Sequence, residues 1–230
     1  MGIFIKEYTR QSAVYTGQPL SVINSHHLFY INVEQFLPRI TDYQKILSTK
    51  ELEKAMRFHR SQDQENFLVR KYALRVILSQ FLHISGKDLE YSQIDNKKPA
   101  IANLHFNSTH SKNVVAIAVS AKDIGVDIEF LKDDFDFSEL LPQCFNLKER
   151  SYIVNGPDSL LKFYTLWTRK EALLKASGEG LTDNLVDVAC LDDILLRKKQ
   201  NFEINSFQTE TSIISVAHAS DQNKLQLWQY

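Results

Sequence analysis

The strongest constraint on this chain is one stretch, residues 167–181, with the sequence WTRKEALLKASGEGL. Trp167, Glu171 and Lys175 recur every fourth residue, so on a helix they share one face, with an acid and a base side by side. Gly178 stands where the left-handed cap of a helix C-terminus is expected. A surface ion pair is the ordinary interpretation of a Glu–Lys pair at this spacing, so other parts of the chain must show whether this helix carries chemistry.

Composition limits the class of protein. With 230 residues, 43% of them hydrophobic and 24% charged, the chain suits one large domain or two small ones and has the balance of a folded globular protein. Its formal net charge of -1 gives no general attraction to nucleic acid or to an anionic membrane. We therefore expect neither of these among its partners.

The cysteines and the N-terminus indicate a compartment. Cys144 and Cys190 stand far apart and match neither a disulfide framework nor a paired metal-ligand pattern, which favours a reducing environment. Residues 1–17 place charges within a few residues of a short apolar run, and no stretch approaches the length of a membrane span. The sequence predicts a cytoplasmic protein without export signal or anchor.

The N-terminal part predicts a strand and then a helix. Residues 28–33 are an apolar run of strand length, and the adjoining His26 and His27 are expected in a solvated loop rather than in a shared metal site. Ser48 and Glu51 have the spacing of a capping box and predict a helix to about residue 60. Its buried side is expected to hold Leu52, Ala55 and Met56.

A second helix is predicted directly afterwards. Ser61 and Gln64 repeat the capping-box spacing. Apolar residues at helical intervals predict its buried stripe, namely Phe67, Leu74, Leu78 and Phe81. Basic residues on the remaining surface usually form a solvated face, but Lys54, Arg70 and Arg75 could line an anionic cleft.

The next segment predicts a strand and a turn. Residues 89–94 alternate as a half-exposed strand does. In the turn that follows, Lys98 precedes Pro99, which biases its backbone away from helix and presents the side chain from an extended loop.

Small hydroxyls then surround a histidine. Thr109, His110 and Ser111 come just before the apolar strand predicted at residues 114–119. Hydroxyls, backbone N–H groups and a histidine are the parts of a phosphate pocket. A Ser/Thr-rich turn that satisfies only its own backbone is the common alternative.

Residues 125–129, with the sequence GVDIE, are more informative. The period of two in a strand sends Val126 and Ile128 to one face and the carboxylates of Asp127 and Glu129 to the other. On a solvated face two carboxylates cost little, whereas in a cleft they call for a cation such as Mg²⁺. The strand alone leaves both readings open.

The C-terminal half continues with helices and strands. Residues 143–153 predict one helix, with Phe145, Glu149 and Ile153 at intervals of four. After the motif at residues 167–181, strands are predicted at residues 202–210, 211–219 and 225–229.

Taken in order, the hydroxyl–histidine segment, the Asp-x-Glu strand and the helix closed by Gly-x-Gly-Leu resemble the 4′-phosphopantetheinyl transferases, specifically the Sfp-type enzymes with the pattern WTxKEAxxKAxGxGL. The resemblance runs from about residue 47 to residue 181. It implies an enzyme of the holo-acyl-carrier-protein synthase type. Such an enzyme transfers 4′-phosphopantetheine from coenzyme A to a serine of an acyl or peptidyl carrier protein and releases adenosine 3′,5′-bisphosphate.

The resemblance also implies which residues bind the donor, coenzyme A. His110 would meet the nucleotide 3′-phosphate from a loop similar to the family's Ser-His-Ser loop, with Thr109 in the first place. Lys54 is similar in position to a basic residue near the adenosine phosphates, and a Lys-Pro segment contacts coenzyme A. The implied donor-binding residues are Lys54, Lys98, Pro99, Thr109, His110, Ser111 and Lys175.

The chemistry implied by the resemblance centres on three positions. Asp127, Glu129 and Glu171 would hold Mg²⁺, and Lys175 would contact the pyrophosphate. Glu171, directly or through water, is the expected base for the serine proton. The expected catalytic set is therefore Glu171, Lys175 and Asp127, and we expect residues 130–152 to receive the helix of the carrier protein.

The family fold is α+β, a pseudo-dimer of two similar α+β halves with the active site in the cleft between them. For this chain it implies an N-terminal half at residues 1–120 and a C-terminal half at residues 121–230 that carries the metal site, in a protein that acts as a monomer. A non-catalytic relative that binds coenzyme A or a carrier protein is the main alternative, and a metal-dependent phosphohydrolase is another. The mass of a carrier protein after incubation with coenzyme A and Mg²⁺ distinguishes the three.

Overall fold

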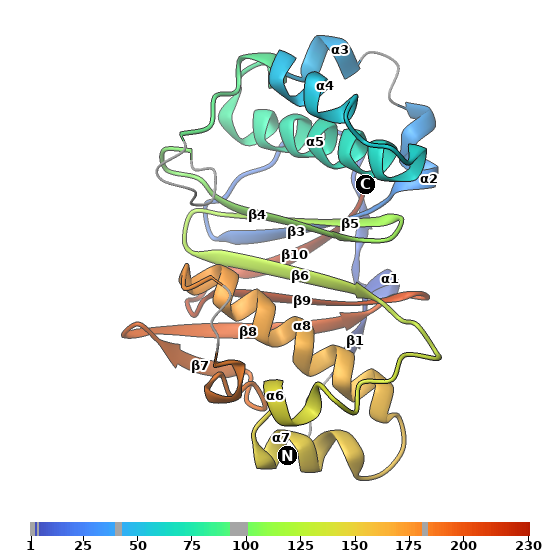
Figure 1. The fold of residues 1–230 in the computed structure, drawn as a ribbon. Coiled ribbons are helices and arrows are strands. Elements are labelled where there is room, and N and C mark those ends of the chain that lie inside the picture. The colour runs from blue at the N-terminus through green and yellow to red at the C-terminus, as the bar shows by residue number, and fades with distance from the viewer. Residues whose placement is uncertain (1–2, 4, 40–42, 93–100, 181–183) are drawn as a thin grey trace. The chain divides into compact units, whose positions relative to one another are not determined.

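The computed structural model describes residues 3, 5–39, 43–92, 101–180 and 184–230, and it has the expected α+β class (Figure 1). The chain forms two compact units. Unit 1 consists of Met1–Gln11 and Lys122–Gln222, and unit 2 consists of Ser12–Ala121 and Asn223–Tyr230.

The division near residue 121 lies beside the one expected at residue 120, but the two chain ends differ from that expectation. Strand β1 (Ile5–Glu7) pairs in parallel with β8 (Gln200–Gln208) in unit 1. Strand β10 (Lys224–Gln229) pairs in parallel with β3 (Ser25–Asn32) in unit 2. Each sheet therefore contains a strand from the far end of the chain, which short-range sequence patterns do not indicate.

Unit 2 is a sheet covered by one long helix. Its strand order is β2-β10-β3-β5-β4, where the remaining bounds are β2 (Ala13–Val14), β4 (His105–Ser111) and β5 (Val114–Ser120). Helix α5 (Ser61–Leu82) lies along one face of this sheet (Figure 1). Because β5 pairs with β3 and β4, all seven of its residues are buried.

The shorter helices of unit 2 are α2 (Val33–Phe36), η1 (Leu37–Arg39), α3 (Tyr43–Ile46), α4 (Thr49–Ala55) and η2 (Gly86–Asp88). The capping box of Ser48 and Glu51 is confirmed at the start of α4. The second box is wrong, since α5 begins after Arg60 with no side-chain cap. Phe67, Leu74 and Leu78 of the α5 stripe are buried as predicted, and Phe81 is partly buried. Met56 after α4 is 78% exposed rather than buried.

Two further predictions for unit 2 are wrong. His26 and His27 lie buried inside β3, because hydrogen-bonding partners satisfy them there: Ser120 for His26, and the nearby Ser21 and the distant Trp228 for His27. In the described part of residues 89–94, namely 89–92, there is no strand and only a single bridge residue at the end. Leu89 is instead buried, and its carbonyl accepts a hydrogen bond from a helix side chain.

Unit 1 has a second sheet of order β1-β8-β9-β6, with β7 on β8. Its further bounds are α1 (Tyr8–Gln11), β6 (Ile124–Phe130), α6 (Leu141–Cys144), α7 (Leu147–Val154), α8 (Ser159–Ser177), η3 (Leu185–Asp187), β7 (Ile194–Arg197) and β9 (Ser212–Ala219). Helix α8, which contains residues 167–177 of the motif, packs on β6 and β9 (Figure 1).

The single helix predicted at residues 143–153 is two helices. Phe145 is extended between α6 and α7, and Asn146 caps α7 by accepting hydrogen bonds from the backbone of Lys148 and Glu149. The Glu149 side chain returns the bond to the Asn146 backbone, which completes a capping box. None of the described helices is long and apolar enough to cross a membrane.

Candidate active site

The site in unit 1 depends on a close contact between α8 and β6. A Cβ placed on Gly125 would lie 2.2 Å from the Ala172 carbonyl oxygen and 2.4 Å from the Ala176 nitrogen. Only glycine therefore allows the helix backbone to lie this near the strand. Since strand side chains alternate, Gly125 and Asp127 point to the same face, toward α8.

Lys175 and Asp127 form the central pair of this contact. The Lys175 Nζ donates to Asp127 Oδ1 at 2.6 Å and to the Val126 carbonyl at 3.4 Å. The Asp127 side chain is 7% exposed and that of Lys175 is 26% exposed. Because the pair is partly exposed, its two members can separate. The ammonium can then bind a substrate phosphate, and the carboxylate can bind a metal ion.

Glu171 lies one turn before Lys175 on α8 and is half-buried. Burial raises the pKa of Glu171, the negative charge of Asp127 raises it further, and the ammonium of Lys175 partly offsets both. The two carboxylates are thus close enough to influence each other. A carboxyl group with its pKa moved toward neutrality is suited to accept and return a proton.

The carboxylates predicted to hold magnesium come from β6 and α8. Glu129 shares the α8-facing side of β6 with Asp127 and is half-buried. Among the described residues, no three His, Cys, Asp or Glu side chains gather as a metal-binding group. The donor set nevertheless fits Mg²⁺, because it consists of carboxylates and because a cation between Asp127 and Glu171 would relieve their repulsion.

In unit 2 the hydroxyl–histidine segment is a strand and not a loop. Thr109, His110 and Ser111 form the end of β4, so their side chains alternate between the two faces of the sheet. His110 pairs with Val115, which belongs to the core beneath α5, and therefore lies on the α5 face. Thr109 and Ser111 point to the opposite face, so a single ligand group cannot meet all three side chains from one side.

The basic residues of unit 2 divide into two roles. Arg75 is buried, donates to Glu51 at 2.7 Å and also donates to the carbonyls of Gly86 and Leu89, so it ties α5 to α4 and to the segment around η2. Lys54 is exposed. It lines a pocket of about 510 Å³ together with Lys50, Glu53, Arg57 and Phe58. Lys98 and Pro99 lie outside the described residues.

Packing, a glycine cap and a buried hydrogen bond hold helix α8 in place. The sequence predicted the first two of these and not the third. Trp167 is stacked on Phe163 with ring centroids 6.1 Å apart and packs against the core of unit 1, as expected. Gly178 caps α8 with φ 66°, in the left-handed region. Thr168 Oγ1 lies 2.8 Å from Ser215 Oγ, which joins the buried side of α8 to β9.

Two charged residues of the motif, Arg169 and Lys170, are buried, and the sequence did not identify this. Lys170 donates to Glu149 at 2.8 Å and to the carbonyls of Leu185 and Val188, and Glu149 also accepts from the Cys190 backbone. Arg169 donates to a run of acceptors in the segment before β7 and on β8, namely the Cys190 and Asp192 carbonyls, the Asp193 carboxylate and the Ser206 hydroxyl. The available signal for a buried Glu149 was its place at intervals of four between the apolar Phe145 and Ile153.

The sequence that contains this helix and strand matches a known family. Residues 123–226 match the model of the 4′-phosphopantetheinyl transferase superfamily. The 4′-phosphopantetheinyl transferase HetI of Nostoc sp. is 30% identical over 164 residues, which cover 67% of this chain and 69% of HetI. The chain therefore belongs to the 4′-phosphopantetheinyl transferase superfamily.

Other relatives indicate the branch of the family. The 4′-phosphopantetheinyl transferase Sfp of Bacillus subtilis is 29% identical over 145 residues, covering 61% of this chain and 64% of Sfp. A Synechocystis sp. relative is 32% identical over 159 residues, covering 66% of this chain and 65% of the relative. The chain is of the Sfp type, and the matched part spans about two thirds of the length of these relatives.

Proposed function

We propose that this chain transfers the 4′-phosphopantetheine arm of coenzyme A to a serine hydroxyl of an acyl or peptidyl carrier protein, releasing adenosine 3′,5′-bisphosphate. Family membership supports the reaction class. The observation that carries the proposal to this chain is the cluster of Glu171, Lys175 and Asp127 at the Gly125 contact. A proton acceptor, a cation and a second carboxylate are what such a transfer requires, because it depends mainly on positioning and on offsetting charge.

The residues of the chain then have separate roles. The serine oxygen forms a bond to the phosphorus that bears pantetheine, and the bond from that phosphorus to the bridging oxygen breaks. Glu171 accepts the serine proton, for which its raised pKa suits it. Lys175 stabilises the negative charge that appears on the bridging oxygen as adenosine 3′,5′-bisphosphate departs.

The residues that would hold Mg²⁺ are Asp127, Glu129 and Glu171. When bound, the ion would offset the negative charge of the pyrophosphate. Lys175 donates to one oxygen of Asp127, so the ammonium and the ion compete for the same carboxylate. The affinity for Mg²⁺ is therefore expected to increase when Lys175 is neutralised.

The surface that receives the carrier protein is proposed to lie in residues 130–152. Phe135 is a poor probe of this surface, because its ring lies 5.8 Å from the rings of Phe163 and Tyr164 and packs with the core. Leu147 at the start of α7 is 76% exposed and is followed by the exposed Lys148. Replacing these two by Ala and Glu should raise the Michaelis constant for the carrier and not that for coenzyme A.

The test is to incubate an apo-carrier protein with coenzyme A, Mg²⁺ and the purified chain and to measure the mass of the carrier. A gain of one phosphopantetheine arm on the carrier serine supports the proposal. Binding of coenzyme A without a change of carrier mass would indicate a non-catalytic relative. Breakdown of coenzyme A without labelling would indicate a phosphohydrolase. Glu171→Gln serves as the matched inactive enzyme.

A further inference from the structure

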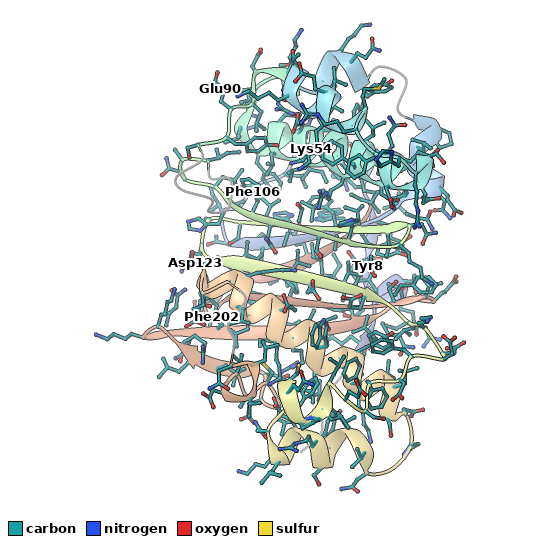
Figure 2. The ribbon with its side chains drawn as sticks, viewed as in Figure 1. Tyr8, Lys54, Glu90, Phe106, Asp123 and Phe202 are labelled. Carbon is teal, nitrogen blue, oxygen red and sulfur yellow. The ribbon has the colours of Figure 1, made fainter. Side chains whose placement is uncertain are left out.

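Strand β7 has one unpaired edge. It forms a hairpin with β8, and the turn between the two strands is Lys198 and Lys199, with φ of 46° and 66°. Phe202, which is labelled in Figure 2, is the β8 residue opposite Leu195. Among the described strands, none pairs with the other edge of β7, which lies at the edge of unit 1 (Figure 1).

The backbone groups of Ile194 and Leu196 point to this unpaired edge. The Asp193 carbonyl accepts a hydrogen bond from the Ile204 nitrogen at 2.7 Å, so Asp193 faces β8. In an antiparallel pair every second residue faces the partner strand, so Ile194 and Leu196 face away from β8. No hydrogen bond within the described chain occupies their N–H and C=O groups.

The side chains of the same two residues are apolar and exposed. Ile194 is 59% exposed and Leu196 is 67% exposed, whereas Leu195 between them packs against the core of unit 1. Because side chains alternate along a strand, Ile194 and Leu196 share the face that is turned away from this core. An edge strand with free hydrogen-bonding groups and apolar side chains is a template on which a further strand can pair.

Charges of opposite sign flank the apolar pair. Four exposed residues, two acidic before β7 and two basic after it, are Asp192, Asp193, Lys198 and Lys199. Asp193 also bonds to Arg169, and Lys198 also donates to the Ser177 carbonyl. A parallel copy of this segment would place acid beside acid, whereas an antiparallel copy places the acidic end of each strand beside the basic end of the other. The segment is therefore complementary to itself in the antiparallel direction only.

We propose that β7 is a docking surface for a second copy of this chain, which adds its own β7 as an antiparallel strand about a two-fold axis. Only residues that face outward on both strands can exchange backbone hydrogen bonds. An axis at Leu195 meets this condition, because it places Ile194 opposite the second copy's Leu196 and Leu196 opposite its Ile194. The same axis places Asp192 beside the second copy's Lys198.

This dimer is weak and differs from the monomer that the family resemblance implies. Strand β7 has 4 residues, so the paired edges bury less area than a permanent interface does. The dimer therefore forms at high concentration of the chain. The inference is independent of the proposed function, because no residue of β7 is assigned to the candidate active site.

The test is the average mass of the chain by sedimentation equilibrium between about 5 and about 500 µM, a range suited to a weak interface. The mass should rise with concentration from that of one chain toward that of two. Leu196→Lys should weaken association at least about tenfold, because it replaces an apolar cross-strand pair by a charge. Ile23→Lys is the matched control and should associate as the wild type does, since Ile23 is 77% exposed and lies in unit 2.

A charge swap tests the register of the two strands. Asp192→Lys places base beside base and should weaken association. Adding Lys198→Glu to Asp192→Lys should restore association, because the two substitutions exchange the signs of residues that lie side by side across the axis. Thermal unfolding of all variants verifies that they are folded.

Each outcome supports or refutes the β7 dimer. A wild type that keeps the mass of one chain throughout the range refutes it. Association that Leu196→Lys leaves unchanged refutes β7 as the surface. A mass beyond that of two chains refutes the two-fold arrangement, because a symmetric contact is complete with the second copy. A charge swap that does not restore association refutes the axis at Leu195.

Discussion

The ammonium of Lys175 on α8 lies 2.6 Å from Asp127 Oδ1 on β6, and this pair is the point at which the motif helix meets the carboxylate strand. The sequence separates the two residues by 48 positions. The pair therefore connects a helix motif, which alone is typical of a surface ion pair, with a strand whose carboxylates alone are typical of a solvated sheet face. Together they bring two carboxylates and an ammonium group to one place.

Asp127→Ala should reduce transfer about 100- to 1000-fold, because it removes both a partner of Lys175 and an oxygen donor for the ion. The chain should remain folded, since Lys175 is partly exposed and keeps its bond to the Val126 carbonyl. The measurement is the rate of carrier labelling alongside thermal unfolding. Glu210→Ala is the control, because Glu210 is exposed and lies outside residues 130–152, the proposed carrier surface. Near-normal turnover of Asp127→Ala would refute the assignment.

The pH dependence of turnover should report on Glu171. As a base, Glu171 acts in its deprotonated form, and its raised pKa means that this form appears at higher pH than for an ordinary glutamate near 4.5. Activity should therefore rise with pH along a limb above that value. Because the charge of Asp127 is one cause of the raised pKa, Asp127→Asn should move the limb of the remaining activity to lower pH. An unmoved limb in kcat against pH would show that another group controls it.

Local patterns predicted those parts of the fold that depend on neighbouring residues. The capping box at Ser48, the buried stripe of α5 and the glycine cap of α8 are confirmed because each is fixed within a few residues. The parallel pairing of β1 and β10 could not be predicted, because strand partners about 200 positions away leave no local pattern.

The candidate site shows the same limit. Asp127, Glu171 and Lys175 were chosen individually by spacing and resemblance, whereas the contact that unites them depends on Gly125 facing the backbone of α8. From the sequence, Gly125 is only a glycine before a valine in a predicted strand, and this does not indicate that a helix packs against it. The alternation of side chains along β4 likewise appeared only once the segment around His110 was seen to be a strand.

Gly125→Ala should destabilise the chain by about 1–3 kcal/mol, as overpacking does, and should lower transfer as well. The added Cβ would overlap the carbonyl of Ala172, and backbone cannot rotate away as a side chain can. Gly86→Ala is the matched control, because there the nearest atom is Cγ2 of the Ile46 side chain at 3.3 Å. Urea unfolding and carrier labelling measure both effects. Equal losses in the two variants would contradict the role of the close contact.

Lys170→Met should destabilise the chain by about 3–5 kcal/mol, because it leaves the Glu149 carboxylate buried without its cation. The Leu185 and Val188 carbonyls would lose their donor at the same time. Lys162→Met is the comparison, since Lys162 is only half-buried and donates to a single carbonyl near the surface. Its loss should cost about 1 kcal/mol or less by urea unfolding. A Lys170 variant as stable as the Lys162 variant would show that the buried pair is not needed.

His27 should make the chain sensitive to acid. Burial lowers its pKa below the ordinary 6.5, in spite of its bond to the Ser21 carbonyl. Its Nδ1 accepts from Trp228 Nε1 at 3.0 Å, so the folded state requires the neutral ring. Since the unfolded chain binds the proton more readily, this stabilisation is complete above about 6.5 and is lost as pH falls through the lower folded pKa.

The measurement is the free energy of unfolding in urea between pH 7.5 and pH 5. His27→Phe should be less stable than the wild type at pH 7.5, because Trp228 Nε1 and the Ser21 carbonyl lose their partner. Its stability should then fall less steeply with acid, because the titrating ring is gone. His59→Gln, at an exposed position, should keep the wild-type slope. If His27→Phe and the wild type lose stability in parallel, protonation of His27 does not contribute to acid unfolding.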